Sequence, residues 1–147
     1  MADFSLNAVI ICDDVRREIS QKDILVGVYG SAIVVSTLPT HINLAFWIEM
    51  EVHKKGLFEL FLKLEFQNSS QNVEFRLGVN IENNTQPVAV FTPQISCFVE
   101  REGQLRLLAK AAESGKYKLI KTRKLLYNPN TSAFFGPLAP GPHHPSV

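Results

Sequence analysis

The clearest chemical signal in the sequence is a run of positive charge near its C-terminal end. Residues 1–100 hold seven basic and twelve acidic residues, whereas residues 101–124 hold eight basic and two acidic ones. The cations in and just before the last predicted strand are Lys116, Lys118, Lys121, Arg123 and Lys124. Such a surface attracts phosphate groups, so a nucleotide or another phosphate-bearing small molecule is one candidate ligand. The structural alternative, which we favour, is that lysines protect an edge strand from pairing with another sheet.

The faces of that strand decide which cations act together. In a regular strand Lys116 and Lys118 share one face and Lys121 and Arg123 share the other, unless a bulge shifts the phase. Only two aromatic residues, Tyr117 and Tyr127, accompany the charges. Base stacking needs more rings than this, so the pattern disfavours nucleic acid as a partner.

Two aromatic residues form a second candidate site. Trp47 and Phe61 fall on a predicted strand face that otherwise carries mostly charged residues. One interpretation is that a second layer or the C-terminal segment, through Phe134 and Phe135, covers them. The other is an exposed aromatic contact for a protein partner or a second copy, because contiguous apolar surface marks interaction sites.

Catalytic and metal-binding patterns are absent from the sequence. The acidic segment 13–23 lacks the alternating Asp spacing and the glycine of a calcium loop, and Arg16 and Arg17 would oppose a cation. The four histidines have no metal-ligand spacing. No serine lies in a nucleophile elbow, and no cysteine has polar activating neighbours. We therefore expect no catalytic residues, no metal and no cofactor, and a protein that is not an enzyme.

Composition places the chain among soluble globular proteins, and we expect a cytoplasmic location. Of its 147 residues, 46% are hydrophobic and 20% are charged, which is ordinary for such a protein. No apolar run is long enough to cross a membrane, and the start resembles no secretory signal. Cys12 and Cys97 lie in apolar runs, which predicts two reduced thiols in the core.

The elements that must position these residues are strands. Between residues 43 and 81 apolar and polar residues alternate, first with the apolar ones at even positions and then, from Val73, at odd positions. A period of two predicts strands with one buried face. Residues 43–52 and 57–66 are expected to form a hairpin closed by Gly56, with Trp47 opposite Lys63.

Turn residues divide the rest of the chain at spacings of about ten residues, which is typical of an all-β sandwich. The first strand, 6–12, is apolar on both faces and is expected at the centre of a sheet, and a loop should follow it over 13–23. The other predicted strands are 24–29 continued by 32–35, 72–81, 88–92, 95–99, 105–111 and 117–127. The expected fold is an antiparallel β-sandwich of about eight strands with an immunoglobulin-like layout.

The last twenty residues differ from the rest. Residues 128–147 hold five of the eight prolines, which cannot donate ladder hydrogen bonds. We therefore divide the chain into a sandwich domain, 1–127, and an extended Pro-rich tail, 128–147. Because the tail carries Phe134 and Phe135, it is expected to dock on its own domain or on a neighbouring subunit.

The opening of the chain resembles a family of small bacterial and phage β-sandwich proteins of unknown function. The resemblance rests on Asn7-Ala8-Val9-Ile10-Ile11-Cys12-Asp13-Asp14-Val15-Arg16 and Lys22-Asp23-Ile24-Leu25-Val26-Gly27-Val28-Tyr29-Gly30. It covers about residues 6–127 and implies a sandwich of bacterial or phage origin. It implies no catalytic residues, since the family has none assigned.

Taken together, these features favour a non-enzymatic protein-interaction module that self-associates. Its partner surface would be Trp47 and Phe61, with Phe134 and Phe135 covering it or joining a homo-oligomer. The alternative is a protein that binds or sequesters a nucleotide or another phosphate-bearing ligand through the five cations of residues 116–124.

Overall fold

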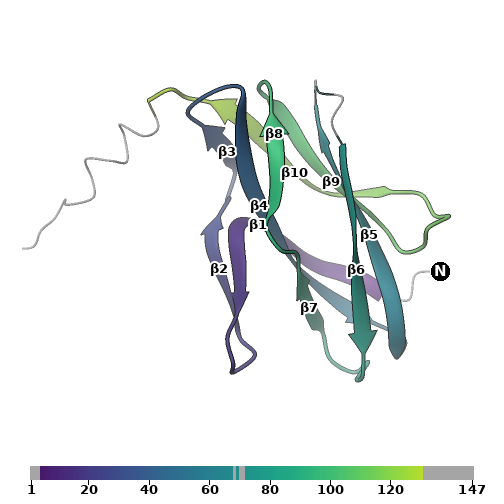
Figure 1. Cartoon of the computed structure of the whole chain (residues 1–147). Coiled ribbons are helices and arrows are strands. Elements are labelled where there is room, and N and C mark those ends of the chain that lie inside the picture. The colour runs from purple at the N-terminus through teal and green to yellow at the C-terminus, as the bar shows by residue number, and fades with distance from the viewer. Residues whose placement is uncertain (1–3, 68, 70–71, 131–147) are drawn as a thin grey trace, which may run out of the picture.

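The computed structural model describes residues 4–67, 69 and 72–130 (Figure 1). These residues form strands and no helix. The ten strands are β1 (Phe4–Arg17), β2 (Asp23–Val28), β3 (Ala32–Val35), β4 (Thr40–Val52), β5 (Gly56–Phe66), β6 (Asn72–Ile81), β7 (Val88–Phe91), β8 (Ile95–Val99), β9 (Gly103–Lys110) and β10 (Lys118–Tyr127). The all-β prediction is confirmed, with two strands more than expected.

The strands form two sheets. The first sheet has the order β2-β1-β4-β7, and β8 also pairs with β4. The second has the order β3-β10-β9-β5-β6 and is curled into a half-barrel. We call it the mixed sheet, because β3 runs parallel to β10 while its other pairs are antiparallel. The expectation of purely antiparallel pairing is therefore wrong at β3.

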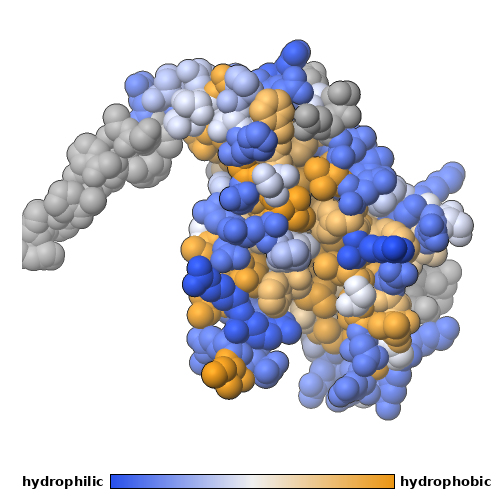
Figure 2. All heavy atoms as spheres, viewed as in Figure 1, coloured by the Kyte–Doolittle hydropathy of each residue, from blue (hydrophilic) through white to orange (hydrophobic). Residues whose placement is uncertain are grey.

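The core lies between the two sheets. Phe46 and Ile48 of β4 and Leu62 and Leu64 of β5 are fully buried and belong to one apolar cluster. These are the even positions of the alternating pattern, so the predicted buried face is confirmed. Figure 2 shows further apolar side chains along the margin where β6 of one sheet approaches β7 and β8 of the other.

The predicted hairpin of β4 and β5 is wrong. β4 pairs with β1, β7 and β8, whereas β5 pairs with β6 and β9. The chain passes from one sheet to the other before Gly56, whose φ of 118° favours glycine. Alternation identifies which face of a strand is buried but not which strand lies beside it, so two facing strands of opposite sheets carry the same pattern as a hairpin.

The change of phase at Val73 has a direct structural cause. β5 and β6 form an antiparallel hairpin in which Phe58 lies opposite Val79, and Leu62 lies opposite Phe75. Even positions of β5 thus pair with odd positions of β6, and both sets face the core. The predicted bounds of β6 are confirmed.

The first strand is longer than expected. Residues 13–17 continue β1 and pair with β2, so the predicted loop shrinks to the turn between Arg17 and Asp23. Charged residues at the end of β1 and the start of β2 form ion pairs: Arg16 Nε lies 3.1 Å from Asp14, and Arg17 Nε lies 2.7 Å from Asp23. The predicted central position of β1 is confirmed, because it lies between β2 and β4. β2 and β3, expected as one strand, lie in different sheets.

Three other predictions concern the cysteines, membrane-spanning segments and the C-terminal tail. Cys12 and Cys97 are buried free thiols, as expected. Among the described residues, no helix is long and apolar enough to cross a membrane. Phe134, Phe135 and the rest of the predicted tail beyond Asn130 lie outside the described residues.

Candidate functional site

The space between the sheets is open along one margin, where β1 faces β10. Residues 4–10 of β1 pair with β4 on one side only, because β2 pairs with β1 from Cys12 onward. Residues 118–123 of β10 pair with β9 only, because β3 pairs with β10 from Lys124 onward. Two incompletely paired strand segments from opposite sheets therefore border the opening.

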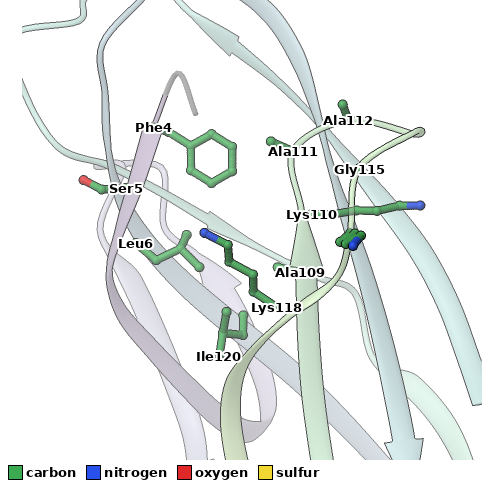
Figure 3. Close-up of a pocket in the computed structure, with 11 residues that line it drawn as sticks. Phe4, Ser5, Leu6, Ala109, Lys110, Ala111, Ala112, Gly115, Lys118 and Ile120 are labelled. Atoms are coloured by element: carbon green, nitrogen blue, oxygen red, sulfur yellow. The ribbon is translucent and has the colours of Figure 1, made fainter. Parts of the chain in front are cut away.

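A pocket of about 510 Å³ lies at this margin (Figure 3). Its lining residues are Phe4, Ser5, Leu6, Ala109, Lys110, Ala111, Ala112, Gly115, Lys116, Lys118 and Ile120. The walls are mainly apolar: Phe4, Leu6 and Ile120 also pack against the core cluster. In Figure 3, Lys118 extends across the pocket toward Leu6, whereas Lys110 points away from it. The pocket thus combines apolar walls with an ammonium group inside its mouth.

A bulge in β10 decides which cations face this opening. The pairing of β10 with β9 shifts register between Leu119 and Lys121, which leaves Ile120 as the extra residue. Before the bulge, Lys118 lies opposite Ala109; after it, Lys121 lies opposite Leu107 and Arg123 opposite Leu105. These three partners are core residues. Because paired residues share a face, Lys118, Lys121 and Arg123 all lie on the core-facing side of β10.

The other two cations are placed differently. Lys116 lies in the turn before β10 and lines the pocket from its rim. Lys124 follows Arg123 and is exposed, so it lies on the outer face of the mixed sheet. The structure therefore brings four of the five predicted ligand-binding cations to one margin and separates Lys124 from them.

These inward cations have few internal partners. Within the described residues, no acidic side chain forms an ion pair with Lys116, Lys118 or Lys121. Arg123 donates from Nε to the backbone carbonyl of Tyr29 at 3.2 Å. A shallower pocket of about 310 Å³ continues along β10 and shares Ile120 with the first one. Apolar and cationic surfaces therefore adjoin along the same strand.

The opening is closed at one end by contacts around Tyr29. The Tyr29 hydroxyl donates to Asp13 of β1, and its carbonyl accepts from Arg123 of β10. Burial raises the pKa of Tyr29, and the neighbouring Asp13 carboxylate adds to the shift. The Asp13 side chain occupies the place that a Cβ on Gly27 would need, and Gly27 has φ of 67°. Tyr29 thus joins the two sheets where the pocket margin ends.

Trp47 and Phe61 do not share a face. Trp47 lies on β4 in the first sheet, where it pairs with Ile10 and Phe91 rather than Lys63. Its indole Nε1 donates to Asp23 at 2.9 Å, and it packs against a small cluster that includes Cys12. The Arg17 guanidinium, with the Trp47 N–H, holds the pKa of Asp23 below its usual range despite desolvation. Trp47 is thus half-buried in its own sheet.

Phe61 lies on β5, on the outer face of the mixed sheet. There it lines a pocket of about 360 Å³ with Tyr117 and charged neighbours. The Lys110 Nζ lies 5.6 Å from the centre of the Phe61 ring and 4.6 Å from that of Tyr117. Both ring contacts are cation–π interactions within the chain. The predicted joint surface of Trp47 and Phe61 is therefore wrong, because the two residues belong to opposite sheets.

Metal ligands and thiols form no further site within the described residues. No group of three His, Cys, Asp or Glu residues that could hold a metal ion occurs within residues 4–67, 69 and 72–130. Burial raises the pKa of Cys97 to about 11 and also raises that of Cys12. Both thiols are thus protonated at neutral pH, which makes them weak nucleophiles.

Comparison with known proteins adds no assignment to this geometry. No protein-family model matches the chain, and a search of curated proteins finds no match either. The family resemblance of the opening segment, and the bacterial or phage origin and cytoplasmic location that go with it, stay predictions.

Sequence reasoning found the cations of this site but not its walls. Leu6 and Ile120 fall in predicted strands as ordinary apolar residues, and Phe4 precedes the first predicted strand. Nothing in their order along the chain indicates that β1 and β10 face each other. The one available signal was Leu119-Ile120, two adjacent apolar residues between lysines, which marks a possible change of phase.

Proposed function

We propose that the protein is a non-enzymatic binding protein that takes an anionic amphiphile between β1 and β10. The apolar part of the ligand would lie against Phe4, Leu6 and Ile120, and its carboxylate or phosphate head would meet the cations of β10. The observation that carries this proposal is the bulge, which places Lys118, Lys121 and Arg123 on the core-facing side beside an apolar pocket.

The walls favour an alkyl or acyl body over a nucleobase. Apart from Ser5 and the lysines, the side chains lining the larger pocket are apolar, so the polar edge of a base would lose its hydrogen bonds to water without replacement. Phe4 already stacks on Phe58, with ring centres 5.3 Å apart. An aliphatic chain needs no such partners. A nucleotide, the ligand class first suggested by the charges, is therefore the weaker candidate.

The immunoglobulin-like layout and the interaction role belong to the same proposal. The order β10-β9-β5-β6 supports the immunoglobulin-like layout by analogy. In a variable-type immunoglobulin sheet the last strand pairs with the preceding one, and that strand pairs with a middle strand.

Calorimetric titration of the full chain with decanoate, decyl phosphate and ATP tests the proposal. We expect the two decyl compounds to bind and ATP to bind more weakly. Lys118→Glu should weaken binding of decyl phosphate roughly ten- to hundredfold, the equivalent of one lost charge-assisted contact. Lys124→Glu is the matched control, because it makes the same charge change on the outer face of the same strand.

Three outcomes would contradict this assignment. Equal losses in Lys118→Glu and Lys124→Glu would reduce the effect to general electrostatic attraction. Preferential binding of ATP would replace the amphiphile with a nucleotide. If none of the three compounds binds, the β1–β10 margin is not a ligand site of this kind.

A further inference from the structure

β6 is the longest free edge strand in the described part of the molecule. It lies at one end of the mixed sheet and pairs with β5 from Asn72 to Ile81 without a bulge. Among the described residues, no strand and no backbone hydrogen bond occupies its other side. The other edge strands of the two sheets, β2, β3, β7 and β8, have four to six residues each. β6 therefore offers the longest row of backbone groups to which another strand could pair.

The first half of β6 is also incompletely covered on its core-facing side. Val73, Phe75 and Leu77 are only half-buried, whereas Val79 and Ile81 are 4% and 3% exposed. β7 and β8 of the other sheet pair with β4 alone, so that sheet ends at this margin too. Figure 2 shows apolar side chains along the margin. The first half of the strand thus combines an open backbone edge with accessible apolar surface.

The outer face of the same stretch carries one negative and one positive charge. Glu74 and Arg76 are exposed and lie on either side of Phe75. Arg76 Nε lies 3.6 Å from Glu59 of β5, but these side chains are 63% and 48% exposed, so Arg76 can contact a further carboxylate. β6 contains no lysine and no proline, the residues that often protect an edge strand. Two charges of opposite sign are its only protection.

From these features we infer that β6 is a self-association surface whose partner is β6 of a second copy of the chain. A two-fold axis perpendicular to the mixed sheet makes the two strands antiparallel and joins two five-stranded sheets into one continuous sheet. With the axis at Phe75, that residue lies opposite its own copy, and Val73 lies opposite Leu77. Glu74 then lies opposite Arg76 of the second copy, and this pair occurs twice. Apolar residues thus meet apolar ones, and opposite charges meet each other.

The charges favour this register over the neighbouring ones. An axis at Glu74 or at Arg76 would place like charges directly opposite each other, which destabilises a strand pair. An axis at Leu77 would place Arg76 opposite Gly78, which has no side chain, and would lose both charge pairs. The axis at Phe75 is the one of these four that pairs both charges, and it lies in the accessible half of the strand.

The expected dimer is weak. Residues 72–78 of each copy take part, which is far fewer than the roughly 20–30 residues a side of a standard stable interface. Association should therefore appear only at high protein concentration. Sedimentation velocity of the full chain from about 10 μM to 1 mM, a range chosen to span weak affinities, measures this directly. We expect a monomer at the low end and a dimer at the high end.

A charge exchange is the decisive experiment. Arg76→Glu places carboxylates opposite each other at both charge pairs and should raise the dissociation constant more than about tenfold. Adding Glu74→Arg to the same chain exchanges the two charges, and it should restore the dissociation constant to within about threefold of the native value. Lys124→Glu is the matched control, because it makes the same charge change on the outer face of the same sheet, three strands away. Thermal melts at low concentration establish that all variants fold.

The inference fails if the native chain stays monomeric at the highest concentration, or if folded Arg76→Glu dimerises as the native chain does. It also fails if the double exchange does not restore the dimer, or if Lys124→Glu abolishes it. None of residues 72–78 lines the pockets along the β1–β10 margin, so these results do not depend on the proposed ligand.

Discussion

The two halves of β10 belong to one strand but lie in different surroundings. Residues 124–127 pair with β3, Lys124 and Leu125 also pair with β9, and Leu125 is only 2% exposed. Residues 118–123 are paired with β9 alone, and their core-facing positions hold Lys118, Lys121 and Arg123. The direction of a side chain toward the core does not by itself bury it. Burial also requires a neighbouring strand and an opposite sheet that close over the position.

The largest expected change in stability comes from exchanging residue types between the two halves of β10. Leu125→Lys would bury an unpaired charge and should lower the free energy of unfolding by roughly 3–5 kcal/mol. Lys118→Leu adds apolar surface in the open half and should change stability by less than about 1 kcal/mol, because Lys118 forms no ion pair with any residue that the structure describes. Urea unfolding of both variants measures the contrast. Similar losses in the two would show that the halves are equally closed.

A second variant tests where the open half ends. Arg123→Ala removes the hydrogen bond from Nε to the Tyr29 carbonyl and should cost about 1–2 kcal/mol. Lys121→Ala, two residues earlier on the same face, removes no such bond and should cost less than about 0.5 kcal/mol. Equal costs, again by urea unfolding, would mean that Arg123 does not mark the boundary.

The smallest expected effect is a change in alkaline stability. Tyr29→Phe removes the hydrogen bond to Asp13 and should cost about 1 kcal/mol at pH 7. Because the pKa of Tyr29 is raised on folding, its contribution is complete below about pH 10 and is lost as the pH rises above that value. The stability difference between the native chain and the variant should therefore narrow in alkali. Parallel stability curves up to pH 11 would contradict this assignment.

The sequence predicts the faces of strands in this protein better than their neighbours. The alternation of Phe46, Ile48, Leu62 and Leu64 correctly identifies the buried faces, since burial of alternate residues needs only a pleated strand. The partners of those strands depend on contacts distant along the chain, and so the expected β4–β5 hairpin is wrong.

The same limit applies to the candidate site: its residue types are predictable from the sequence, but its neighbouring strands are not. Its cations are visible as a cluster of like charges, and a bulge was recognised as the condition under which they would act together. The position of that bulge depends on the pairing of β10 with β9, and the apolar walls depend on the approach of β1. Both are tertiary features that one strand's residues do not encode. For the same reason, the hydrogen bond from Trp47 to Asp23 could not be predicted, because it depends on the pairing of β1 with β2 and with β4.

The parallel pair of β3 and β10 has a consequence for how the chain reaches its native state. It joins residues 32–35 to residues 124–127, so about ninety positions must be synthesised and brought into a loop before this contact forms. Folds dominated by such remote pairings assemble slowly, on the order of milliseconds to seconds. During ribosomal synthesis, the apolar residues Ile33 and Val35 therefore stay unpaired until β10 has been made. We expect chaperones to bind the nascent chain mainly in this interval.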